Sequence, residues 1–170
     1  MWRVVIIPSL LAGCQVQLDV EEVRLSYRNV EVKGGGNGMG ASKHGFTFDD
    51  LSALEELVEL GADIRFAGAE LRATSGVDDM SFVDQLQLAV ASADPDAGLP
   101  ALVLYGCKGN CGAHGQGIEM KPEKKPHAGD YLGTGSLLID LDIVGKLPGK
   151  PWTLDVDVVL EAHAEYELGR

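Results

Sequence analysis

The sequence predicts a mainly β protein whose fold is an antiparallel β-sandwich of about seven strands, with long glycine-rich loops and at most one short helix. Apolar and polar residues alternate with a period of two in several separate runs, as in strands with one buried face. Segments rich in glycine, proline and aspartate separate these runs. Only one stretch has the spacing of an amphipathic helix. Two sheets packed face to face suit this pattern best, and a single barrel is the alternative.

The first alternating run changes phase partway along its length. Its apolar residues occupy even positions from 16 to 20 and odd positions from 23 to 27, with Glu21 and Glu22 between them. A one-residue phase change within a strand is what a β-bulge produces, so a bulge is expected at these two glutamates. Valines at 30 and 32 continue the strand. The following segment, 33–46, is so rich in glycine that it predicts a mobile loop.

The middle of the chain contains the helix candidate and three further strands. Residues 49–60 place apolar side chains on one side and acids at the start, which predicts a short helix. Alternating runs at 63–74 and 81–92 predict two strands. Residues 99–105 are almost all apolar, as in a central strand that is buried on both faces.

The clearest pattern in the chain is the C-terminal run, 152–168. Its even positions are apolar and nearly all of its odd positions are polar, which predicts a long strand with one face on a core. Residues 137–143 alternate in the same way. Because the connection at 146–151 contains two prolines and a glycine, we expect a turn that makes these two strands an antiparallel pair.

Residues 106–135 form a long segment rich in glycine, lysine and proline. Loops of this length are usually functional or disordered. Two interpretations remain open: a specific contact surface, or a solvated insertion that is ordered only at its cysteine turn.

The first fourteen residues have the order of an export signal. A positive charge at Arg3 precedes an apolar run from Val4 to Leu10, and two small residues then precede Cys14. The tetrad from Leu11 to Cys14, Leu-Ala-Gly-Cys, resembles the lipobox of bacterial lipoproteins. A buried first strand over residues 4–11 is the structural alternative, although its proline would remove a ladder hydrogen bond.

The resemblance implies a lipid anchor. It implies that the Cys14 thiol receives a diacylglyceryl group, that residues 1–13 are removed, and that the new amino terminus is acylated. Each buried methylene contributes about 0.8 kcal/mol, so two or three acyl chains anchor a protein stably. Gln15 stands where an inner-membrane retention signal often has Asp. The resemblance therefore implies an address in the outer membrane of the bacterial envelope, with residues 14–170 as a single domain.

The charge of the chain restricts its partners. The formal net charge is −12, and loss of Arg3 with the leader makes it more negative. An acidic surface repels phosphate groups, so nucleic acid is not an expected partner. The expected partners are the membrane, through lipid at Cys14, and an envelope protein.

Cys107 and Cys111 lie in a glycine-rich turn and pair if Cys14 is lipidated. A disulfide is the expected state in an oxidising envelope. The alternative is a zinc or copper site made of these two thiolates with His114 and His127, whose ligand types suit either metal. The Cys-x3-Cys spacing excludes a redox-active Cys-x-x-Cys motif.

Two acidic segments contain residue types that can bind a cation. Glu161, His163 and Glu165 share one face of the last strand, where they form either a divalent-cation site or a solvated face whose charges prevent pairing with another molecule. Asp94 to Gly98 contains two acids and a glycine but lacks the distal ligands of a calcium loop, so it predicts an ordinary turn.

The sequence predicts no catalytic residue and no cofactor, because none of the common nucleophile or metalloprotease motifs occurs. The expected function is that of a lipid-anchored binding or structural module. A metal-binding or hydrolytic domain that uses the 106–135 segment is the alternative.

Overall fold

The computed structural model describes residues 15–33, 40–48, 51–109, 111, 115–132 and 136–167. Eight strands and two short α-helices lie within them. In chain order they are β1 (Gln15–Val32), β2 (Gly40–Phe48), α1 (Ser52–Glu59), β3 (Asp63–Ser75), β4 (Val83–Ser92), β5 (Leu102–Lys108), β6 (Gly117–Met120), α2 (Gly129–Leu132), β7 (Leu137–Gly145) and β8 (Trp152–Glu167). A 3-10 turn, η1 (Pro95–Ala97), joins β4 to β5.

The strands form two antiparallel sheets of four strands each. The first sheet has the order β1-β8-β3-β6, and the second has the order β2-β7-β4-β5. The predicted β-sandwich is therefore confirmed, with eight strands where about seven were expected. The short helix α2 is additional to the expected helix, and α1 confirms the one predicted over 49–60.

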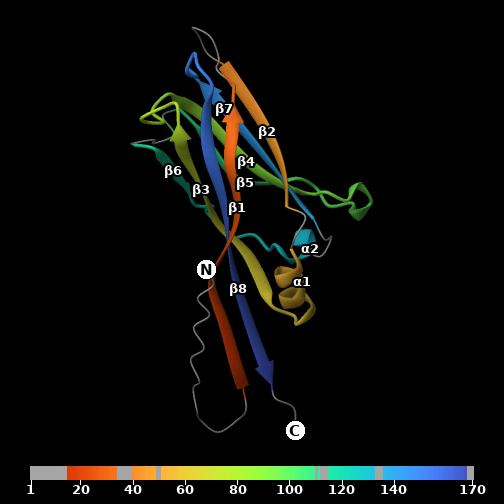
Figure 1. The fold of residues 1–170 in the computed structure, drawn as a ribbon. Helices are drawn as coiled ribbons and strands as arrows, with labels where there is room; N and C mark the ends of the chain where they lie inside the picture. Colours follow the sequence, from red (N-terminus) through yellow and green to blue (C-terminus); the bar gives the residue numbers. More distant parts are fainter. Residues whose placement is uncertain are drawn as a thin grey trace.

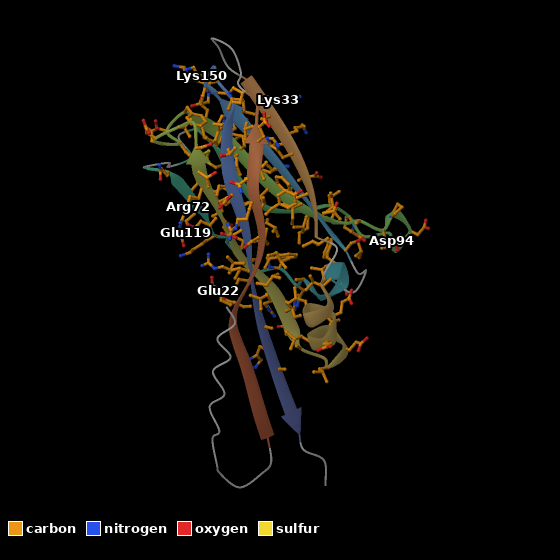
Figure 2. The ribbon with its side chains drawn as sticks, viewed as in Figure 1. Glu22, Lys33, Arg72, Asp94, Glu119 and Lys150 are labelled. Carbon is orange, nitrogen blue, oxygen red and sulfur yellow. A yellow bond between two sulfur atoms is a disulfide. The ribbon has the colours of Figure 1, made fainter. Side chains whose placement is uncertain are left out.

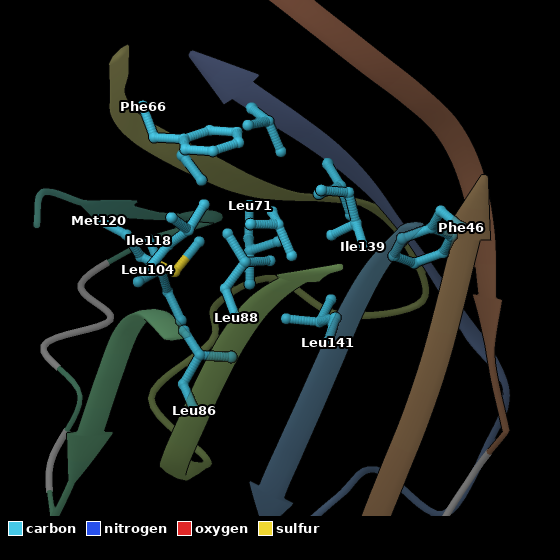
Figure 3. Close-up of a cluster of buried hydrophobic side chains, with 14 of the residues drawn as sticks. Phe46, Phe66, Leu71, Leu86, Leu88, Leu104, Ile118, Met120, Ile139 and Leu141 are labelled. Atoms are coloured by element: carbon cyan, nitrogen blue, oxygen red, sulfur yellow. The ribbon is translucent and has the colours of Figure 1, made fainter. Parts of the chain in front are cut away.

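The core lies between the two sheets and is built from the inward face of each strand (Figure 3). The period-two pattern of the last strand is confirmed in β8, where Leu154, Val156, Val158 and Leu160 are fully buried. Across the core, alternate residues of β7 from Leu137 to Ile143 are equally buried. Burial of one face of every long strand is the main source of stability for such a sandwich.

The bulge predicted at Glu21 and Glu22 is confirmed. The pairing of β1 with β8 shifts register between Val20 and Val23, so the two glutamates together form the irregularity. A second shift lies between Tyr27 and Val30 and was not predicted. There Asn29 adopts φ 56°, a conformation that asparagine tolerates better than most residues.

The expected pairing of the last two strands is wrong. β7 lies between β2 and β4 in the second sheet, whereas β8 lies between β1 and β3 in the first. The connection at 146–151 crosses from one sheet to the other, and Leu147 within it is buried in the core. Alternation shows which face of a strand is buried, but it does not identify the neighbouring strand.

The mobile loop predicted over 33–46 is also wrong for the part that the structure describes. Residues 40–48 form β2, which pairs with β7 from Gly40 to Phe48. Phe46 is buried, and its ring lies 4.7 Å from that of Tyr27 on β1, which closes one side of the sandwich. Strand pairing here overrides the weak β propensity of the small residues in this segment.

Two expectations for the second half of the chain need correction. Residues 99–105 do not form a central strand, because β5 begins at Leu102, lies at the edge of its sheet, and leaves Val103 53% exposed. The segment 106–135 is more than an insertion ordered only at its cysteines. It contains β6 and α2, with Met120 and Leu132 buried in the core.

The ends of β1 and β8 extend beyond the rest of the sandwich as a two-stranded ribbon (Figure 1). Gln15 pairs with Glu167 at the tip, whereas the pairing of β3 with β8 ends at the Asp63–His163 pair. The first and last residues of the described domain therefore lie side by side at one end of the molecule.

Candidate functional site

The outer face of the first sheet carries a network of ion pairs. Arg28 on β1 contacts Asp155 at 3.3 Å and Asp157 at 2.8 Å on β8. Farther along β1, Arg24 pairs with Glu70 on β3 at 3.2 Å and also with Glu22. These contacts link three neighbouring strands across the solvent-facing side of the sheet.

A groove of about 270 Å³ crosses this face. β1 and β6 form its two sides, and β8 and β3 lie between them. Figure 2 shows Glu22 and Glu119 on one flank of the molecule, opposite the flank that carries Asp94. We call this feature the outer groove.

An interruption at the free edge of β3 accounts for the position of the outer groove. β6 covers this edge only from Ala69 to Arg72. The chain then leaves it and returns where the Phe66 N–H donates to the Pro126 carbonyl, at 2.9 Å. The outer groove opens beside the intervening residues of β3, where the register of β3 on β8 also shifts.

The floor of the outer groove consists of small or apolar residues, whereas its rim is charged. Ala67, Gly68, Ala69 and Val159 line it with small or apolar groups. A Cβ atom at Gly68 would lie 2.7 Å from the Met120 carbonyl oxygen, so glycine is what allows the end of β6 to approach this closely.

The rim is charged, and each of its carboxylates is paired with a cation. Glu22, Glu70, Glu119 and Glu161 line the outer groove, as do the two cations Arg24 and Lys121. Lys125 holds Glu161 at 2.6 Å. Hydrogen bonds from Arg72 and Arg24 to the Glu70 carboxylate outweigh its partial burial and lower its pKa. Glu70 is therefore ionised at neutral pH.

His127 is held close to the outer groove and not at the cysteine turn. Its Nδ1 lies 2.8 Å from Asp63, whose other carboxylate oxygen accepts a hydrogen bond from Arg65 Nε, also at 2.8 Å. Partial burial acts to raise the pKa of Asp63, but these two hydrogen bonds together lower it below its ordinary value. The backbone of His127 bridges Arg65 in the first sheet, whereas Cys107 lies in the second sheet.

The predicted disulfide is present. Cys107 and Cys111 are bonded, with their Cα atoms 5.7 Å apart. Gly109 between them has φ 76° and donates its N–H to the Asp84 carbonyl at 2.7 Å, which fastens the turn to the start of β4. The disulfide leaves neither sulfur as a thiolate for the alternative metal site, and His114 lies outside the described residues.

Replacing both cysteines of this turn with serine should lower stability only modestly. The closed loop is short, so the crosslink removes little entropy from the unfolded chain, and we expect a loss of about 2 kcal/mol or less. Urea unfolding of the wild type, the wild type with reductant, and the double variant measures this. A loss of most of the unfolding free energy would contradict this view of the turn.

Glu161 and His163 on the last strand do not converge on one site. Glu161 pairs with Lys125, and His163 lies opposite Asp19 and Asp63 on the two adjacent strands. β8 is paired on both sides up to His163, and beyond it only with β1. The side chain of Glu165 lies outside the description. In the described part of the chain, no group of three or more histidine, cysteine or acidic side chains is placed to hold a metal ion.

The turn predicted at Asp94 to Gly98 is present. The Asp94 side chain accepts a hydrogen bond from the Asp96 N–H at 2.9 Å, and Gly98 ends the turn with φ 65°. Glycine suits that left-handed conformation.

A serine and a histidine lie close together on β2, a pair that the sequence did not suggest. Ser42 Oγ and His44 Nε2 are 2.7 Å apart, and burial lowers the pKa of His44. The His44 ring is parallel to that of Phe46 on the same side of the strand. Neither Ser42 nor His44 lines the outer groove.

The sequence pattern does not reveal the outer groove either. Its residues come from four strands that are far apart in the chain, and only strand order and register bring them together. The available signal was the set of charged residues at outward positions of the runs 15–32, 63–74 and 152–168.

Comparisons with known proteins identify no family. No family model matches the chain, and no curated protein matches it. A solved structure described as Desmodium yellow mottle tymovirus is similar at 10% identity with a TM-score of 0.23, covering 99% of this chain and 94% of that chain. Within the described residues, no helix has the length and apolar character needed to cross a membrane.

Proposed function

We propose that this protein is a bacterial cell-envelope lipoprotein, anchored by lipid at Cys14, whose acidic β-sandwich acts as a binding or structural module without catalytic activity. The observation that carries the proposal is the tetrad Leu11 to Cys14 behind an apolar run and Arg3. These residues lie outside the part of the chain that the structure describes.

The architecture supports this proposal in one respect. β1 begins at Gln15, directly after the cysteine, and its first residue pairs with the last residue of β8. A lipid at Cys14 would therefore attach to the tip of the ribbon, at the end opposite the 146–151 crossover (Figure 1). An anchor at that end leaves the charged outer face of the first sheet accessible in the envelope.

Lipid attachment is tested by metabolic labelling. We expect the full chain, expressed in a bacterium supplied with radiolabelled palmitate, to take up label and to fractionate with the outer membrane. Cys14→Ser should lose both properties, because it removes the only thiol that the lipobox would present. The matched control is Ser9→Ala, which changes the leader and keeps that thiol. Equal label in Cys14→Ser and in the wild type would disprove the lipid anchor.

A further inference from the structure

We propose that β5, an edge strand of the second sheet, pairs with β5 of a second copy of this chain, so that the two four-stranded sheets become one continuous sheet. The two strands run antiparallel about a twofold axis that is perpendicular to the sheet and passes between Leu104 and Tyr105. The proposal does not depend on the lipid anchor, because the residues that carry it lie in β4, in β5 and in the turn that joins them.

β5 is an edge strand without charges to protect it. It pairs with β4 on one side, and no strand in the described part of the chain pairs with its other side. The residues from Leu102 to Cys107 include no charged side chain. The other three edge strands, β1, β2 and β6, all contain charged residues. Because charges along an edge oppose association with another strand, β5 is the edge at which association is opposed least.

A bulge in β5 selects a second copy over an ordinary extended segment. The pairing of β4 with β5 shifts register at Leu104, which is an extra residue without a partner on β4. Leu104 is buried in the core and Tyr105 packs against it, so two successive side chains point inward. A regular strand added to this edge would lose phase there, because its side chains alternate strictly between the two faces. A second copy of β5 has the same irregularity at the same place.

One antiparallel register keeps the two copies in phase along the strand. It places Leu104 of each copy opposite Tyr105 of the other, so the two bulges face each other. Leu102 and Cys107, which both pack against the core, are then also opposite each other. A slip of one or two residues in either direction would place an inward residue opposite an outward one, which sheet pairing does not allow.

The outward residues of this register are complementary in shape. Val103 is 53% exposed, and in the proposed register it lies opposite Gly106 of the second copy. A Cβ atom added at Gly106 would meet nothing within 4 Å, so the outer face of the sheet is open there. The Val103 side chain of each copy therefore covers the open space at Gly106 of the other. The twofold axis produces this contact twice, and each contact removes apolar surface from water.

The charges near the two ends of β5 favour the antiparallel orientation. β5 ends at Lys108, which is exposed, and it follows the turn that contains Asp94 and Asp96 (Figure 2). Antiparallel pairing brings the Lys108 end of each strand toward the acidic turn of the other copy, so opposite charges approach each other. Each copy also carries a net charge of −12, and the resulting repulsion limits the affinity at low salt.

Sedimentation equilibrium of the full chain in density-matched detergent, in about 0.15 M salt, tests whether the copies associate. In detergent, no common membrane fixes the orientation of the two copies. A contact between two edge strands buries less surface than the roughly 1,600 Å² of a standard interface. We therefore expect a reversible dimer with a Kd on the order of 10 µM.

Two lysine variants locate the contact. Val103→Lys should raise the Kd at least about tenfold, because it replaces the covered apolar group with a charge on the edge strand. Thr47→Lys is the matched control, since it adds the same charge at an exposed position of β2, the opposite edge of the same sheet. It should change the Kd less than about twofold. Thermal melting followed by circular dichroism establishes that both variants are folded.

Cysteine crosslinking determines the register. Val103→Cys and Gly106→Cys are prepared as separate chains, both with Cys14→Ser to remove the thiol at that position, and are then oxidised with copper phenanthroline. Opposite residues of an antiparallel pair have Cα atoms about 4.5–5.5 Å apart, within reach of a disulfide. Two copies of position 103 would be offset by three residues, or about 10 Å, which is too far. We expect a crosslinked dimer in the mixture of the two variants and in neither variant alone.

Three outcomes would overturn the proposal. One is a mass that stays that of a single chain up to about 1 mM. Another is equal weakening by Val103→Lys and Thr47→Lys, which would place the contact on a different surface. The third is crosslinking in either single variant as strong as in the mixture, which would show a different register.

Discussion

Val158→Asp is expected to abolish the folded state of the domain, whereas Val159→Asp, one residue away, leaves it folded. Val158 is fully buried between the two sheets, while Val159 lies half-buried on the outer face. A carboxylate at 158 would be an unpaired charge in an apolar core, which costs several kcal/mol. Since a domain has only about 5–15 kcal/mol of stability, that loss is enough to unfold most of it.

Circular dichroism with heating and with urea measures this contrast. For Val158→Asp we expect loss of the cooperative transition at neutral pH, with recovery in mild acid, where the new carboxylate is protonated. For Val159→Asp we expect a cooperative transition shifted by only a few degrees, because its carboxylate remains in contact with water. Equal stability of the two variants would show that β8 does not direct its even positions into the core.

β8 could be predicted from the sequence for a simple physical reason. A strand with one buried face alternates apolar and polar residues along its own sequence. The alternation from Trp152 onward therefore predicts the strand and its buried face without knowledge of any neighbouring strand. The bulge at Glu21 and Glu22 was predictable for the same reason, because a register shift changes the parity of the apolar residues within the strand itself.

The errors concern properties that lie between strands. β2 contains small and polar residues with little β propensity, and its strand conformation depends on its pairing with β7 and on the packing of Phe46. The crossover after Gly145 has the composition of a hairpin turn, yet it joins different sheets. Local composition carries no information on which sheet the next strand joins.

The same reasoning explains which parts of the candidate site were predictable. The cysteine turn is local in sequence, so its disulfide could be predicted from the glycine-rich turn that brings the two cysteines together. The outer groove is nonlocal, because Arg24 and Glu70 meet only when β1 and β3 lie on either side of β8. Neither residue stands out in the sequence, where each is one of many charged residues on a strand.

Gly145→Ala should cause a second large loss of stability, and this loss comes from the backbone and not from a charge. Gly145 ends β7 and pairs with Gly40 on one side and Val83 on the other. A Cβ atom at this position would overlap the Phe82 carbonyl oxygen and would lie 3.0 Å from the Asp84 amide nitrogen. Both are backbone atoms, so no side chain can rotate away to make room.

We expect Gly145→Ala to lower the free energy of unfolding by about 3 kcal/mol, at the upper end of the range for overpacking. The reason is that the start of β4 must shift to admit one methyl group. Gly106→Ala is the matched control: it lies in β5 of the same sheet, and its added Cβ would meet nothing within 4 Å. There, alanine should be neutral or slightly stabilising, since it restricts the unfolded chain more than glycine does.

Urea unfolding of the two variants compares them directly. If both unfold at the wild-type urea concentration, the turn that precedes β4 does not pack against Gly145. If only Gly145→Ala unfolds early, the close approach of β7 to this turn limits which residue can end the strand, although nothing in the sequence around this glycine distinguishes it from those in open turns.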